Sequence, residues 1–375
     1  MTRVTSQALT GHDDQVATAA APAPLVRRIP ARTVTAMLAT AARAPSVHNT
    51  QPWRFAVGTH AIDLWADPAR KLRHDVAGRE MLISCGAALF GLRLAVREIG
   101  YLPAVSLFPE PSRPGLLARV TLGPQAPVTA LERRMLAALP HRHTHRGAFD
   151  PAAVPAGLLA GLQHDALAEG ATLALIDSPG GYAKLAALVA EATRLQALNA
   201  AVREEVLRWT RAPGSPAGDG VSAAAFAPGG AAAPGYLAQR DFDLGRHCGL
   251  LPRHGPDEPP PAATAVLVTP GDGRADWLRA GQALHRVLAH AATVWVSASL
   301  HTQPLEFSAI RAIIRTRLAL PGAVQMLLQF GTARTSMSSP RRPVPEFLVQ
   351  APVAVDGGPK VPGLGPHSPL NGRSG

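Results

Sequence analysis

The 375-residue chain contains only two cysteines, Cys85 and Cys248. They form neither a disulfide framework nor the closely spaced ligand pair of a zinc site, and two isolated thiols predict a reducing, cytoplasmic location. No run of about eighteen apolar residues occurs, which predicts that no segment spans a membrane. Residues 1–24 carry charged residues and no apolar segment, so they lack the pattern of a signal peptide.

Lysine is nearly absent, and aromatic residues make up only 5% of the chain. The formal net charge of +11 therefore comes almost entirely from arginine, whose planar fork binds phosphate and carboxylate groups bidentately. Apart from short clusters the arginines are scattered, which argues against a nucleic-acid partner. Apolar residues still account for 47%, so alanine, leucine and valine must build a large core.

The most informative stretch is Ala-Pro-Ser-Val-His-Asn-Thr-Gln-Pro-Trp-Arg-Phe at 44–55. A helical pattern precedes it, and Pro45 ends that helix because proline disfavours helical geometry in the residue before it. Polar residues then fill a short loop that closes at a second proline, and Trp53 begins an alternating, strand-like pattern. The residues alone fit a proline-terminated connection in front of core aromatics, or a donor-rich loop that binds a flat polar ring.

A second polar stretch, His-Arg-His-Thr-His-Arg-Gly-Ala-Phe at 141–149, follows a predicted helix. Period-two alternation places Arg142, Thr144 and Arg146 on one side of an extended segment, where two guanidinium forks and a hydroxyl would form a phosphate cradle. A solvated charged loop is the alternative. The three intervening histidines suggest a metal site, but no acidic or cysteine partner stands close in sequence. We therefore expect exposed histidines and no metal.

Residues 44–55 resemble the flavin-edge loop of the nitroreductase-like FMN proteins, and the His-Asn-Thr variant is most similar to their Acg family. The 142–149 segment is similar to the one that holds the FMN phosphate in these proteins. Residues 341–342 look like a C-terminal basic pair that adds to the phosphate, and residues 303–307 resemble a turn whose backbone amides approach the flavin N5. The FMN-binding residues that this resemblance implies are Pro45, Ser46, Val47, His48, Asn49, Gln51, Arg142, Thr144, Arg146, Glu306, Arg341 and Arg342.

The phosphate segment stands in mid-chain, so the resemblance implies two nitroreductase-type subunits fused into a pseudo-dimer, with further oligomerisation left open. The expected fold class is α+β, with an antiparallel-rich sheet packed by helices in each half. The first half, 25–130, carries the ring loop and the second, 131–350, carries the phosphate segment, which predicts one FMN per chain. Disordered tails are expected at 1–24 and 351–375. Residues 212–240 are expected to form a lid over the flavin, or else a flexible insertion.

The resemblance also implies an FMN-binding oxidoreductase of the nitroreductase type. Electrons from NADH or NADPH would pass through the flavin to a small electron-poor acceptor, a nitro compound or a quinone. No catalytic acid or base is identifiable in the sequence, and this chemistry requires none. The alternative is a protein that stores or sequesters FMN under a closed lid that excludes nicotinamide.

Apolar periodicity predicts the remaining elements. Strands at 55–57 and 62–65 should form a hairpin, and a long, almost wholly apolar helix at 80–99 should be buried. The other expected helices span 128–139, 158–167, 181–211, 275–297 and 310–318, and the other expected strands span 105–108, 116–122, 264–268 and 324–330.

Overall fold

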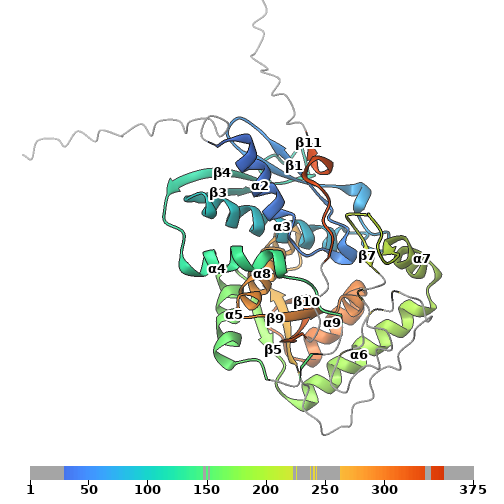
Figure 1. Ribbon diagram of the computed structural model, residues 1–375. Coiled ribbons are helices and arrows are strands. Elements are labelled where there is room, and N and C mark those ends of the chain that lie inside the picture. Colours follow the sequence, from blue (N-terminus) through green and yellow to red (C-terminus); the bar gives the residue numbers. More distant parts are fainter. Residues whose placement is uncertain are drawn as a thin grey trace, which may run out of the picture.

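The computed structural model describes residues 29–146, 149–150, 153–222, 225, 237, 240, 242, 262–333 and 339–349. The tails predicted at 1–24 and 351–375 lie outside the described residues, as does much of the predicted lid at 212–240. The architecture is α+β, as predicted, with two antiparallel-rich sheets packed by helices (Figure 1).

The first sheet has five strands in the order β11-β1-β2-β4-β3. The predicted hairpin is confirmed, because β1 and β2 pair antiparallel with Phe55 opposite Leu64. At the end of the chain β11 adds to β1 in parallel, so the last described residues return to the sheet where the chain began. The bounds are β1 Trp53–Val57, β2 Ile62–Ala66, β3 Tyr101–Leu107, β4 Leu116–Gln125 and β11 Leu348–Val349.

The second sheet has four antiparallel strands in the order β5-β8-β10-β9. The helix predicted at 275–297 is wrong at its end, because α8 stops at Ala292 and β9 begins at Val296. The turn between them contains Trp295 at φ 62°, a left-handed conformation that ends the helix and reverses the chain. The bounds are β5 Thr172–Leu175, β8 Ala263–Thr269, β9 Val296–Leu300 and β10 Ala323–Thr332, and a separate two-stranded pair joins β6 Thr210–Arg211 to β7 Val221–Ser222.

The single helix predicted at 181–211 is also wrong, because the structure divides it at Asn199. Asn199 leaves helical geometry, and its side chain accepts hydrogen bonds from the backbone of Ala201 and Val202, as an N-cap residue does. The helices are α2 Ala31–Ala41, α3 Arg79–Glu98, α4 Ala130–Ala138, α5 Ala156–Ala168, α6 Pro179–Leu198, α7 Ala200–Trp209, α8 Arg274–Ala292 and α9 Ser308–Arg317, with short 3-10 turns η1 Val47–Asn49, η2 Pro68–Arg70, η3 Leu139–His141, η5 Gln303–Glu306 and η6 Val344–Glu346.

The two long helices α3 and α8 lie between the sheets (Figure 1). Each helix contributes side chains to the hydrophobic cores of both sheets. Ile83 of α3 packs in the core around the second sheet, and Leu278 of α8 packs in the core around the first. Their backbones touch at two glycines. A Cβ on Gly281 would lie 1.9 Å from the Ile83 carbonyl oxygen, and one on Gly86 would lie 2.2 Å from that of Leu278. Only glycine fits at either position.

We expect Gly281→Ala to destabilise the protein by about 1–3 kcal/mol or more, because the added methyl group meets backbone atoms that cannot rotate away. Urea unfolding followed by circular dichroism measures this change. Gly157→Ala is the matched control, since a Cβ there meets nothing within 4 Å and alanine favours the helix by up to about 1 kcal/mol. A Gly281→Ala variant as stable as the parent would contradict the close helix contact.

His285 lies at the same contact between α3 and α8 and is fully buried. Its Nδ1 stands 2.6 Å from the Ala87 carbonyl oxygen, which can only accept, so Nδ1 carries the proton. Burial, with the nearby charge of Arg142, lowers the pKa of His285 to about 3. The ring is therefore neutral in the folded protein throughout the physiological range.

The pKa of His285 lies below its unfolded value of about 6.5, so its contribution to stability is present above pH 6.5 and is lost as the pH falls towards 3. Between pH 7 and pH 5 this loss amounts to about 2 kcal/mol. His285→Gln, which keeps a donor for Ala87 and does not titrate, should lose less stability by about that amount. Urea unfolding at both pH values measures the difference, with the exposed His60→Gln as control. Equal losses in the parent and His285→Gln would refute the assignment.

Candidate functional site

The loop at 46–51 is held in an unusual backbone conformation. His48, Asn49 and Gln51 have φ angles of 50°, 54° and 48°, in the left-handed region that side chains other than glycine rarely adopt. The Ser46 hydroxyl accepts a hydrogen bond of 3.0 Å from the Gln51 amide and closes the loop on itself. Strained backbone of this kind persists only where the surroundings enforce it, and it is concentrated at binding and catalytic sites.

The side chain of Asn49 ties the loop to two distant segments. Its amide nitrogen lies 3.1 Å from the carbonyl oxygens of both Gly220 and Pro340. The Gly220 amide returns a 3.3 Å hydrogen bond to the Asn49 carbonyl. Asn49, which the resemblance predicts to bind FMN, joins the loop to residues 218–220 and to residues 340–342.

Gln51 makes the same two connections and is completely buried. Its amide nitrogen donates to the Gly218 carbonyl at 2.8 Å, and its amide oxygen accepts from the Arg342 backbone at 3.0 Å. Neither Gln51 nor Asn49 is among the residues that line the neighbouring cavity. The side-chain hydrogen bonds of Asn49 and Gln51 therefore hold the loop in its strained conformation.

A cavity of about 700 Å³, its opening included, lies beside this loop. Residues 45–48 form one wall, residues 144–146 form another, and residues 302–303 at the start of η5 form a third. Arg240 and Phe242 also reach it. The structure thus brings the two polar stretches singled out in the sequence to one place.

His48 lies in the wall of this cavity with only 5% of its surface exposed. Its ring packs edge-on against Phe242, and neither ring nitrogen has a hydrogen-bond partner among the described residues. Burial, with the charge of Arg240 nearby, lowers the pKa of His48 well below its usual value. The neutral ring offers one donor and one acceptor, and such buried groups require a partner.

Arg142, Arg146 and Arg341 bring positive charge to the same region without a counter-charge. No carboxylate of the described residues pairs with any of them. Arg142 is 5% exposed, donates from one nitrogen to the Arg43 carbonyl at 3.0 Å, and has two further guanidinium nitrogens without a partner. Burial lowers the pKa of Arg142 and of Arg146 to about 10. Buried cations are costly when left uncompensated, so this cluster favours an anion.

The two C-terminal arginines have different surroundings. Arg341 donates to the carbonyl oxygens of Ala42, Arg43 and Ala44, beyond the C-terminal end of α2, and burial and the charge of Arg142 lower its pKa to about 9. Arg342 instead pairs with Glu346 at 3.1 Å and donates to the Gln51 carbonyl at 3.3 Å. Only Arg341 therefore adds charge to the Arg142 cluster, whereas Arg342 fastens the C-terminal segment to the loop.

The prediction that the three histidines of the 141–145 run are exposed is wrong for His145. Only 8% of His145 is exposed, and its side chain reaches the cavity. The reason is that this segment joins the second sheet: Thr144 bridges to Ala298 in parallel, and the His145 amide donates to the Ala298 carbonyl at 2.9 Å. Both sides of the segment are therefore covered, while His141 remains exposed.

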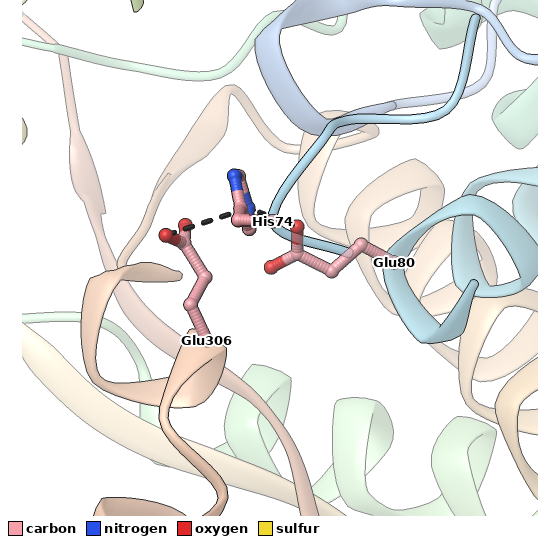
Figure 2. A group of neighbouring side chains, drawn as sticks. All are labelled: His74, Glu80 and Glu306. Carbon is pink, nitrogen blue, oxygen red and sulfur yellow. Dashed lines mark hydrogen bonds and ion pairs between the residues drawn. The ribbon is translucent and has the colours of Figure 1, made fainter. Parts of the chain in front are cut away.

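Glu306 belongs to a second polar group that the sequence did not reveal. Figure 2 shows His74, Glu80 and Glu306 pointing toward one another. The His74 Nε2 lies 3.1 Å from a Glu80 oxygen and 3.4 Å from a Glu306 oxygen. Arg240 forms an ion pair with Glu306, so this group, here called the His–Glu cluster (His74, Glu80, Glu306), stands behind the cavity wall. The Glu306 side chain itself does not line the cavity.

Burial and charge oppose each other in the His–Glu cluster. Burial lowers the pKa of His74, but the hydrogen bond with Glu80 and the charge of Glu306 outweigh it and raise that pKa to about 9. Burial raises the pKa of Glu306 to about 7, and Arg240 limits this rise. His74 and Glu80 are close in sequence, but the cluster could not be predicted because Glu306 comes from a distant part of the chain.

Comparison with known proteins identifies the chain's relatives. Two Mycobacterium tuberculosis proteins, each named a putative NAD(P)H nitroreductase, match it over most of their length. The first is 33% identical over 320 residues, covering 84% of this chain and 89% of the relative. The second, named acg, is 30% identical over 322 residues, covering 83% and 94%. The chain belongs to this nitroreductase family. The predicted Acg-type resemblance is thereby confirmed.

Other comparisons add less to the family assignment. No protein-family model matches the chain. Two crystal structures of FMN-bound nitroreductases superpose partially. The Bacteroides fragilis enzyme has a TM-score of 0.34 at 13% identity, covering 56% of this chain and 93% of that one. The Desulfitobacterium hafniense enzyme has a TM-score of 0.35 at 12% identity, covering 58% and 98%.

Among the described residues, no helix is both long enough and apolar enough to cross a membrane.

Proposed function

We propose that the protein is an FMN-binding oxidoreductase of the nitroreductase type that takes electrons from NADH or NADPH. The observation that carries this proposal is that buried Arg142 and half-buried Arg146, neither paired with a carboxylate among the described residues, belong to one segment at a cavity to which a strained loop presents a neutral histidine. The relatives' names support the reaction class and the nicotinamide donor.

The arginine cluster has the chemistry required to hold the FMN phosphate. Arg142 presents two unpartnered guanidinium nitrogens, and Arg146 and Arg341 add positive charge. Thr144 lines the cavity and would supply a hydroxyl. A phosphate dianion would compensate the buried cations and accept charge-assisted hydrogen bonds, which are stronger than neutral ones. These residues therefore fit an anionic cofactor better than an uncharged one.

The loop has the chemistry required to hold the edge of the flavin ring. A flavin edge carries both carbonyl acceptors and an N–H donor, and neutral His48 offers one donor and one acceptor. Pro45, Ser46 and Val47 line the same wall. Asn49 and Gln51 act from behind, because their hydrogen bonds keep the loop in its left-handed conformation. We propose that each chain holds one FMN.

FMN, when bound, supplies the transfer of hydride or electrons from nicotinamide to a small electron-poor acceptor such as a nitro compound or a quinone. The protein's own residues bind and orient the cofactor. Arg142 and Arg146 would hold its phosphate, and the loop at 45–48 would hold the edge of its ring. No acid or base from the protein is required, since the acceptor can take protons from water.

A second candidate function is storage or sequestration of FMN, and one observation favours it. Within the described part of the predicted lid, residues 218–220 are held by ion pairs and hydrogen bonds to the loop and its neighbours. Asp219 forms an ion pair with Arg211 at 2.8 Å and another with Arg70, and the backbone at 218–220 is tied to the loop through Asn49 and Gln51. A segment held in this way would restrict the approach of a second ring to the flavin.

Arg142→Ala should weaken FMN binding roughly ten- to a hundredfold, because each hydrogen bond to a charged group contributes about 1.5–3 kcal/mol. Riboflavin lacks the phosphate, so its weaker binding should change little. Fluorescence titration of the flavin-free protein with both ligands measures the two constants. Arg134→Ala, an exposed arginine on α4, is the matched control and should behave as the parent does. Equal weakening of both flavins would show that Arg142 supports the loop or the ring and not the phosphate.

Rapid mixing of the FMN-loaded protein with NADH or NADPH separates turnover from storage. We expect loss of the oxidised flavin absorbance at a rate that rises with nicotinamide concentration, and reoxidation when a nitro compound or quinone is added. Dithionite, a small reductant, is the control that shows the flavin can be reduced at all. If dithionite bleaches the flavin and neither nicotinamide does, the storage function is correct and the oxidoreductase proposal fails.

A further inference from the structure

The His–Glu cluster is not used in the proposed flavin site. Glu80 lies in the first turn of α3, His74 lies in the loop before it, and Glu306 is the last residue of η5 (Figure 2). One ligand atom from each residue lies within 4.8 Å of the other two. Both carboxylates are almost completely buried.

We propose that His74, Glu80 and Glu306 bind one divalent transition-metal ion of the zinc type. The His74 Nε2 stands 3.1 Å and 3.4 Å from the two carboxylate oxygens. Ligands bound to zinc at about 2.0–2.1 Å in a tetrahedron lie about 3.3–3.4 Å from one another. The His74 nitrogen is therefore spaced from each carboxylate oxygen as two adjacent ligands of one ion are, and the two carboxylates offer oxygens within 4.8 Å of each other.

The donor set selects the class of metal. An imidazole nitrogen with two carboxylates suits zinc and its transition-metal neighbours, whereas calcium and magnesium prefer oxygen donors alone. One oxygen of Glu80 is buried without a hydrogen-bond partner in the part of the chain that the structure describes, so this carboxylate has a second lone-pair donor available to the ion. With a bidentate Glu80, or with a water in the remaining position, the ion would reach four-coordination.

The elements that carry the ligands are held in place independently of any ion. Asp75 accepts a 2.9 Å hydrogen bond from the Met81 amide, which fixes the His74 loop against the start of α3. Glu306 is oriented by Gln196, whose amide nitrogen lies 2.6 Å from its carboxylate, and by its ion pair with Arg240. Hydrogen bonds of this kind to a ligating carboxylate are a regular feature of metal sites.

The charges leave room for a cation. With the neighbouring Asp75, three carboxylates face two permanent cations, Arg79 and Arg240, so one negative charge requires further compensation. A proton on His74 or a metal ion at the same position would each provide it. These two occupants predict different behaviour on addition of zinc, which makes the proposal testable without flavin and independent of the proposed enzymatic function.

Isothermal titration of the tag-free, full-length protein with Zn²⁺ tests the site. We expect one ion per chain, and we expect Glu80→Gln and Glu306→Gln each to weaken binding by more than about a hundredfold, beyond the ten- to hundredfold cost of losing an outer partner. His141→Gln, an exposed member of the other histidine run, is the control and should leave the affinity unchanged. Absence of binding, or binding that both glutamine variants retain, would overturn the proposal and leave an adventitious ion only.

A measurement on the unaltered protein decides the question if either variant fails to fold by circular dichroism. Crystals soaked in Zn²⁺ should show anomalous scattering at the zinc edge between His74, Glu80 and Glu306, with metal–ligand distances of about 2.0–2.2 Å. An anomalous peak only at the 141–145 histidines, or no peak on the cluster, would refute the assignment.

Discussion

The close contact of α3 and α8 is the constraint on which the rest of the structure depends. The two helices touch backbone to backbone at Gly86 and Gly281, so the spacing between the two sheets is set by main-chain atoms and not by side chains that could repack. Residues from both helices, Ser84 and Leu284, also line the cavity. A shift between the helices would therefore alter the cavity floor as well as the relation of the loops above it.

Two kinds of buried charge lie on either side of the cavity wall, and they differ in how they are compensated. Arg142, Arg146 and Arg341 have no carboxylate partner among the described residues, and carbonyl oxygens offset only part of their desolvation. Arg240 has such a partner in Glu306 and connects the cavity to the His–Glu cluster. Arg146 lines the cavity without a carboxylate partner among the described residues, and Arg240 lines it with one. Arg142 and Arg341 lie outside the lining. An anionic ligand would therefore compensate charge that the described carboxylates leave unpaired.

The sequence predicted much of the fold, because its signals there are local. The apolar residues of α3 and the alternating pattern of β1 and β2 each act within one element, and both predictions are confirmed. The errors also have local causes that periodicity does not register. At Asn199 a side chain caps the following helix and divides one apolar pattern into two helices, and after Ala292 a left-handed tryptophan ends a helix early.

The candidate site was predictable only in part, because its chemistry depends on long-range contacts. The family resemblance picked out residues 45–51 and 142–146, and the structure places Pro45, Ser46, Val47, His48, Thr144 and Arg146 in the lining of one cavity. Arg142 lies outside that lining, as do the side chains of Asn49 and Gln51. The partners of those two side chains, at 218–220 and 340–342, come from elsewhere in the chain and follow no spacing rule. The grouping of His74 and Glu80 with Glu306 is likewise a long-range contact that follows no spacing rule.

The loop's shape is therefore a tertiary property and not a local one. Backbone strain of order 1–3 kcal/mol for each left-handed residue must be offset by contacts from other segments, since a free peptide of this sequence would relax it. Asn49 and Gln51 provide those contacts. Asn49 donates hydrogen bonds to both distant segments, and Gln51 donates to the first and accepts from the second. It follows that the orientation of His48 depends on residues 218–220 and 340–342 as much as on its own neighbours. Residues 218–220 and the loop that forms part of the cavity wall are thus joined by hydrogen bonds, so a displacement of residues 218–220 would change the position of His48 in that wall.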